Sequence, residues 1–205
     1  MAARTAARDY ITWKRVSDRA NWAPRLCRAP FPTGTQFSRS TSSDTHGRKL
    51  YFLFAKLPDD YPGFGFLPQP GSPDSRKQPL GQTLVKESFT PARSTRDEAL
   101  AAMTPQDHKE SRELPPTFTR TDSGDSVDYW RTDQPAGLFI MFKVDPAESP
   151  ATNGWVYATT DPAGKLSAVG PIASCIECHR SAEHDGLFGL PWVQDGDYFT
   201  KPSPK

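Results

Sequence analysis

Five consecutive residues late in the chain have types and spacing that could carry chemistry together. Cys175-Ile-Glu-Cys178-His179 fits the Cys-x-x-Cys-His pattern of c-type haem attachment. Cysteines three residues apart lie on nearly the same face of a helix, so both sulfurs can reach the two vinyl groups of one haem, while the adjacent His179 presents its ring to the iron. The pattern predicts one covalent haem c on Cys175 and Cys178, with His179 as the metal ligand.

Two other kinds of site use a Cys-x-x-Cys pair. A zinc site needs a second pair of Cys or His ligands nearby, and the one remaining cysteine, Cys27, does not supply it. A thioredoxin-like site needs a parallel sheet and a pair that opens a helix near the first strand, whereas this pair lies late in the chain. Haem attachment is therefore favoured. It leaves Cys27 as a further thiol, either buried and inert or linking two copies of the chain.

The identity of a sixth iron ligand divides electron carriers from haems that bind or convert small molecules. Typical electron-transfer cytochromes place a Met ligand far downstream of the haem motif, but no Met follows His179. Met141 lies upstream in an apolar stretch that is typical of a protein core. His184 is too close to the axial ligand in sequence to reach the opposite face of the haem. We therefore expect a five-coordinate iron that binds small molecules such as nitric oxide, carbon monoxide or hydroxylamine.

Composition excludes several function classes. The 25 basic and 24 acidic side chains nearly cancel, and no basic run is long enough to bind a polyanion, so nucleic acid is not an expected partner. No stretch approaches the roughly 18 to 20 consecutive apolar residues of a membrane span. The first eight residues lack the apolar centre of a secretory signal. We expect either a protein that stays inside the cell or one whose export signal has been removed.

Short strands and a few helices are expected to position the haem motif. The 21 prolines and 14 glycines argue against a helix bundle, and the length predicts one domain over 1–205. Apolar spacing predicts an N-terminal helix from Ala6 to about Val16, and a capping box predicts a short helix over 94–103. Apolar or alternating stretches predict strands at 50–56, 82–89, 137–144, 154–160 and 165–169.

These elements predict an α+β fold, with a mainly antiparallel β-sheet, an N-terminal helix and a C-terminal haem-bearing helix. The segment 104–127 is polar and has no periodicity, so we expect it to be a surface insertion.

Several segments follow one another in a fixed order along the chain: His46-Gly47, 81–87, 138–143, 154–157, the haem motif and Asp185-Gly-Leu-Phe188. This order resembles the cytochrome P-460 family, which includes the β-sheet cytochromes called c′-beta. The resemblance covers most of the chain, and it implies a five-coordinate, His-ligated haem c against an antiparallel sheet, usually in a homodimer. Because such haem is normally attached outside the cytoplasm, it also implies a periplasmic protein.

Members of that family differ in what they do at the haem. Some oxidise hydroxylamine, and in these a lysine of the matching strand is covalently joined to the porphyrin; the matching residue here is Lys86. Others lack the cross-link, have an aromatic cap over the open iron face and bind nitric oxide. Lys86 does not choose between them, and it also fits a solvent-facing strand residue paired with an acid.

Polar groups near the open face would separate these activities, because hydroxylamine oxidation needs a positioned proton acceptor. Glu183 and Asp185 are the candidate catalytic carboxylates, although both also fit a solvated helix terminus. We expect a nitric oxide binder, with hydroxylamine oxidation as the alternative and electron transfer to a redox partner protein as the third possibility. The candidates for an aromatic cap are Phe52, Phe54, Phe64 and Phe66.

Overall fold

A computed structural model describes residues 1–17, 19–22, 49–61, 77–123, 126–180, 182 and 185–187. Within these ranges, eight strands form one sheet with the order β1-β3-β4-β6-β7-β8, while β2 pairs with β3 and β5 pairs with β6. The strands are β1 Lys14–Arg15, β2 Asn21–Trp22, β3 Leu50–Ala55, β4 Thr83–Ser94, β5 Phe118–Ser123, β6 Ser126–Lys143, β7 Trp155–Thr160 and β8 Leu166–Gly170. The helices are α1 Ala2–Asp9, α2 Arg96–Ala101, α3 Pro105–Lys109 and α4 Ala173–His179, with 3₁₀ turns η1 Tyr10–Thr12, η2 Pro58–Asp60 and η3 Pro150–Thr152.

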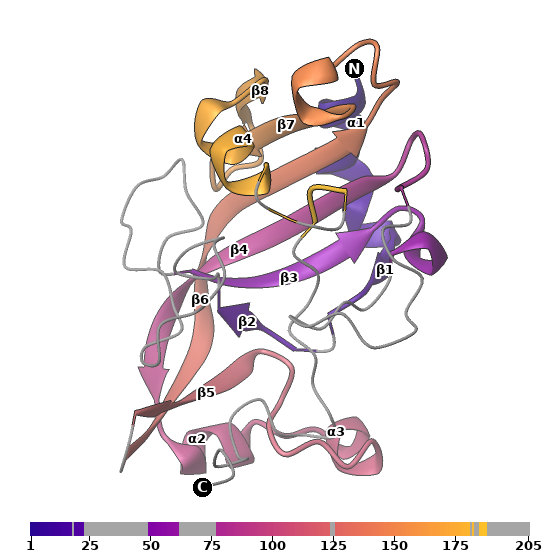
Figure 1. Ribbon diagram of the computed structural model, residues 1–205. Helices are drawn as coiled ribbons and strands as arrows, with labels where there is room; N and C mark the ends of the chain where they lie inside the picture. Colours follow the sequence, from indigo (N-terminus) through magenta and orange to yellow (C-terminus); the bar gives the residue numbers. More distant parts are fainter. Residues whose placement is uncertain are drawn as a thin grey trace, which may run out of the picture.

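Every strand pair of this sheet is antiparallel. The predicted α+β fold, with a mainly antiparallel sheet and an N-terminal helix, is confirmed. The long strands β4 and β6 run side by side through the centre, and β6 carries β5 and β7 along its other edge (Figure 1). None of the described helices has the length and apolar character that a membrane crossing requires.

Alternation along the strands gives the sheet two apolar faces. On one face, which we call the α1 face, Val85, Ile140 and Ala158 pack against Ala3 and Ala6 of α1. The other face, the α4 face, carries a row of side chains paired across the central strands: Ala55, Leu84, Met141 and Tyr157. Helix α4 lies against this second face, on the opposite side of the sheet from α1 (Figure 1).

The N-terminal helix begins and ends earlier than its apolar spacing predicts. Helix α1 covers Ala2–Asp9, and the chain is extended from Trp13 onward. Tertiary pairing explains the early end, because β1 pairs with β3 and the Val16 amide donates a hydrogen bond to the Leu53 carbonyl at 2.8 Å. These contacts draw residues 14–16 into the sheet.

The segment 104–127, predicted as a surface insertion, contains more structure than its polarity indicates. It includes α3, whose capping box joins Thr104 and Asp107, and β5, which pairs with the first half of β6. Strand β5 is concealed in the sequence because threonines occupy its inward positions. Thr121 is buried and accepts a hydrogen bond from the Trp22 indole at 2.9 Å. About a third of the segment therefore belongs to the sheet.

Candidate cofactor site

Helix α4 places the residues of the Cys-x-x-Cys-His pattern against the sheet. Cys175 and Cys178 are half-buried, and the side chain of His179 at the last helical position is buried, with 8% of the residue exposed. Ile172 and Ile176 pack, together with Cys175, against the cluster of buried side chains on the α4 face. This packing fixes which side of the helix faces the sheet, so Cys175 and His179 turn toward the same space.

That space is a pocket between α4 and the α4 face of the sheet. Its lining is mainly apolar and aromatic. Strands β3, β4, β6 and β7 supply the floor, while α4 and Leu187 close the other side. The lining residues are Leu53, Tyr61, Leu84, Lys86, Phe139, Ile140, Met141, Tyr157, Ala158, Cys175, His179 and Leu187.

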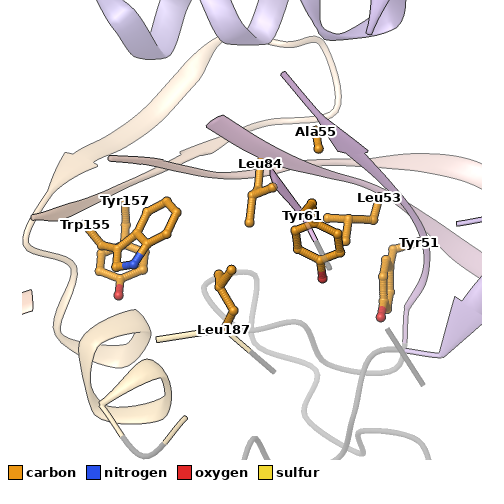
Figure 2. Close-up of a cluster of buried hydrophobic side chains, with 8 residues drawn as sticks. All are labelled: Tyr51, Leu53, Ala55, Tyr61, Leu84, Trp155, Tyr157 and Leu187. Carbon is orange, nitrogen blue, oxygen red and sulfur yellow. The ribbon is translucent and has the colours of Figure 1, made fainter. Parts of the chain in front are cut away.

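Three tyrosines share the α4 face with this lining. Figure 2 shows Tyr51, Tyr61 and Tyr157 with their hydroxyl groups pointing away from the strands, toward the side on which Leu187 lies. The ring of Tyr157 lies 5.4 Å from the ring of His179, centroid to centroid, at an interplanar angle of 42°. Aromatic walls of this kind suit a flat, largely apolar group.

A hydrogen bond to the backbone orients the ring of His179. Its Nδ1 lies 2.6 Å from the carbonyl oxygen of Gly186. A carbonyl oxygen only accepts, so Nδ1 carries the proton and Nε2 keeps its lone pair. Burial lowers the pKa of His179 to about 4, against the hydrogen bond to Gly186 that raises it, and the charge of Lys86 lowers it further. The ring is therefore neutral at physiological pH, the form in which imidazole binds metals.

The turn after α4 delivers that carbonyl. Asp185 and Gly186 both have positive φ, 52° and 76°, and a Cβ on Gly186 would lie 3.3 Å from the indole of Trp155. The same indole donates a hydrogen bond to the Asp185 carbonyl at 2.6 Å. Only glycine combines this backbone conformation with so close an approach to an aromatic ring at no cost. Gly186 is thus needed for the contact with His179.

Asp185, a predicted catalytic carboxylate, is bound on all sides instead of facing the pocket. Its two oxygens accept from Lys143 Nζ at 2.8 and 2.9 Å, from the Asn153 amide at 2.7 Å and from the Gln78 backbone amide at 2.7 Å. Its side chain is 2% exposed. A carboxylate that holds four hydrogen bonds has no acceptor site left for a substrate proton. The geometry favours a structural role for Asp185 over proton transfer.

Lys86 belongs to the pocket lining. It lies on the α4 face of β4, opposite Leu53 and Phe139 on the neighbouring strands, and is half-buried. Its Nζ sits 4.8 Å from the centre of the Tyr51 ring. Its charge also contributes to the low pKa of His179, which places the two side chains within electrostatic reach. The alternative of a lysine turned to open solvent does not fit this position.

The two described phenylalanines predicted as an aromatic cap lie on the wrong side of the sheet. Phe52 packs against Phe89, and Phe54 packs edge-on against Tyr10, both away from the pocket. Alternation explains the error, because residues 51, 53 and 55 of β3 take the α4 face. Phe139 of β6 does line the pocket, and so does Met141 of the same strand. Side chains alternate between the two faces of a strand, so residues 139 and 141 of the apolar stretch 138–142 share one face.

Several predicted residues lie outside the described residues: Cys27, His46, Phe64, Phe66, Glu183, His184 and Phe188. Over the ranges that the structure does describe, no three His, Cys, Asp or Glu side chains gather closely enough to hold a metal ion between them. Among the side chains in these described ranges, none joins Cys175 and Cys178 to complete a zinc site. The antiparallel sheet likewise lacks the parallel order that a thioredoxin-like pair requires.

The buried ring of His179 predicts a pH dependence for the chain without cofactor. Its pKa is about 4 when folded and 6.5 in an unfolded chain, so stability is complete above pH 6.5. As pH falls from 6.5 to 4, only the unfolded chain takes up the proton, and the free energy of unfolding should drop by about 3 kcal/mol. Urea unfolding at pH 7.0 and 4.5 measures this. The variant His179→Gln should lose the slope and the exposed control His108→Gln should keep it; equal slopes in both variants would contradict the assignment.

Comparisons of the chain with models of protein families and with curated proteins give no match. What the site can do therefore follows from its own residues. They are a buried imidazole, neutral and protonated on Nδ1, two cysteines on the same short helix, and a mainly apolar pocket against the sheet.

Proposed function

We propose that Cys175 and Cys178 hold one haem c in this pocket, with His179 as axial ligand, and that the open face binds small nitrogen oxides such as nitric oxide. The hydrogen bond from His179 Nδ1 to the Gly186 carbonyl carries the proposal. A histidine that ligates a metal almost always donates its other ring N–H to a carbonyl or carboxylate, which fixes the tautomer and raises the basicity of the ligating nitrogen. His179 already has this arrangement.

The residues present fit the group. Cys175 and His179 border the same pocket, and its floor of Leu84, Phe139 and Met141 offers apolar contacts to a flat macrocycle. A haem held by Cys175, Cys178 and His179 would supply an iron that binds small molecules. The mainly apolar lining of the pocket suits a small neutral ligand better than a charged one.

Hydroxylamine oxidation is the second candidate, and the position of Lys86 favours it. In the cytochrome P-460 family, which the chain resembles, the matching lysine is joined to the porphyrin in members with this activity. Lys86 lines the pocket and lies within electrostatic reach of His179. Mass spectrometry of peptides that contain Lys86 tests for the cross-link, and turnover of hydroxylamine with an artificial electron acceptor tests the activity. If Lys86 is unmodified and hydroxylamine is not turned over, hydroxylamine oxidation is ruled out and nitric oxide binding remains the proposed function.

Electron transfer would be favoured by a sixth iron ligand from the protein. Met141 is the candidate for this ligand because it lines the pocket. We predict that Met141→Leu, which nearly conserves the side-chain volume, leaves the absorption spectra of both oxidation states high-spin and unchanged. The partly buried Met103, which is not part of the pocket lining, provides a control in Met103→Leu. A low-spin wild-type spectrum that Met141→Leu converts to high-spin would favour electron transfer instead.

The family resemblance also supports a periplasmic location, a homodimer and a redox partner protein. Light scattering of the purified protein measures the oligomeric state. Titration of the ferrous protein with nitric oxide tests the function itself: we expect saturable binding of one molecule per haem. A ferrous protein whose spectrum does not respond to nitric oxide would contradict the proposal.

A further inference from the structure

We propose that the buried ion pair between Lys143 and Asp185 is the device that positions the axial histidine. This inference rests on the proposed function, because it concerns the bond between His179 and the haem iron. The ion pair does not touch His179. It acts through the turn at Asp185 and Gly186, whose carbonyl accepts the His179 proton.

The pair is fully enclosed and fully hydrogen-bonded. The side chains of Lys143 and Asp185 are 3% and 2% exposed, and Lys143 Nζ also donates to the Asn153 carbonyl at 2.6 Å. Lys143 thus makes three contacts with oxygen, which uses its three donors, and Asp185 holds four, which uses its acceptor sites. Neither group has a position left for another partner.

The ion pair joins three distant parts of the chain at one point. Lys143 ends β6, Asn153 lies just before β7, and Gln78 precedes β4. All three converge on the Asp185 carboxylate, while Trp155 binds the carbonyl of the same residue. The sheet thereby clamps the backbone of Asp185 from several sides, and the next peptide unit presents the carbonyl of Gly186 to His179.

The buried ion pair is explained better by its effect on the orientation of the turn at Asp185 and Gly186 than by a contribution to folding stability. A buried ion pair costs desolvation energy, and well-packed apolar side chains in its place are often at least as stable. The carboxylate does something that apolar side chains do not, because four directional hydrogen bonds fix a turn of two positive-φ residues in one geometry. A fixed Gly186 carbonyl keeps the His179 hydrogen bond short, and a strong bond at Nδ1 raises the basicity of the ligating nitrogen.

We call the hydrogen bonds that Lys143, Asn153 and Gln78 donate to the Asp185 carboxylate the clamp. Weakening the clamp should weaken the electron donation from His179 to the iron. The mild variant is Asn153→Gly, which removes one bond to Asp185 and keeps the positive φ of 51° that this position has. Its matched control is Ser111→Gly, because Ser111 is exposed, has a φ of 53° and lies in the turn after α3. The strong variant is Lys143→Met, which removes the cation of the pair.

The readouts are the iron–histidine stretching frequency of the ferrous protein, its reduction potential and its haem content. We expect Lys143→Met to lower the frequency and to shift the ferric–ferrous equilibrium roughly tenfold toward ferrous, which is about 59 mV for one electron. Asn153→Gly should shift both in the same direction by less, and Ser111→Gly should shift neither.

The two proposals fail in different ways. If Asn153→Gly binds a full complement of haem and keeps the wild-type frequency and potential, the clamp is overturned and the haem site stands; Asn153→Gly decides this even if Lys143→Met does not fold. If the wild-type protein carries no haem, or its ferrous form shows no iron–histidine band, the proposed function falls and the clamp falls with it.

Discussion

Replacing both Cys175 and Cys178 by alanine should reduce the covalently bound haem of the purified protein to background. Both thiols lie half-buried on α4, and Cys175 lines the pocket together with His179. Alanine is the best helix former, so the change removes two bonds to the haem without disfavouring the helix that carries them. Each single variant keeps one thiol and should retain part of the covalent haem.

Haem staining after denaturing electrophoresis, together with intact mass, measures this loss. The matched control is Cys27→Ala, which removes the one thiol outside the motif and should leave the haem content at the wild-type level. Covalent haem that persists in the double variant, or that disappears in Cys27→Ala, would contradict the assignment of the two anchors.

The substitution Lys143→Met should lower the free energy of unfolding by about 3 to 5 kcal/mol. It leaves the Asp185 carboxylate buried without its cation, and an uncompensated buried charge is among the most costly defects in a folded protein. This loss should appear even in the chain without cofactor, because the ion pair is part of the folded polypeptide.

The double variant Lys143→Met/Asp185→Leu is the control that separates charge from packing. It removes both members of the pair, so it should regain a large part of the lost stability. It should not restore the iron–histidine frequency, because the four hydrogen bonds that fix the turn are gone. A double variant as unstable as Lys143→Met would show that packing, and not the buried charge, dominates the effect.

The sequence predicts the local parts of this site and little of its long-range geometry. The spacing of Cys175, Cys178 and His179 is a local pattern, and so is the alternation that puts Lys86 on one face of its strand. The contact of Asp185 with Lys143 joins residues 42 positions apart, and no local pattern specifies it. Asp185 therefore has the sequence signature of a solvated helix end and the surroundings of a buried core residue.

The same limit applies to the fold. Strand β3 is apolar enough to be identified, but it is buried on both faces and gives no period that tells which of its phenylalanines face the pocket. Helix α1 covers one face of the sheet and α4 covers the other. Which face Phe52 and Phe54 take therefore depends on how helices distant in sequence pack against the sheet. Strand β5 is hidden for a different reason, since two of its buried positions, Thr119 and Thr121, hold polar residues.

The intact mass and the ferrous absorption spectrum of this chain, produced in a periplasm that attaches c-type haem, show whether Cys175 and Cys178 carry a covalent haem. We predict the mass of the polypeptide plus one haem, located on the peptide that contains Cys175 and Cys178, and a high-spin ferrous spectrum with one histidine ligand. A polypeptide that emerges at its unmodified mass would contradict the account.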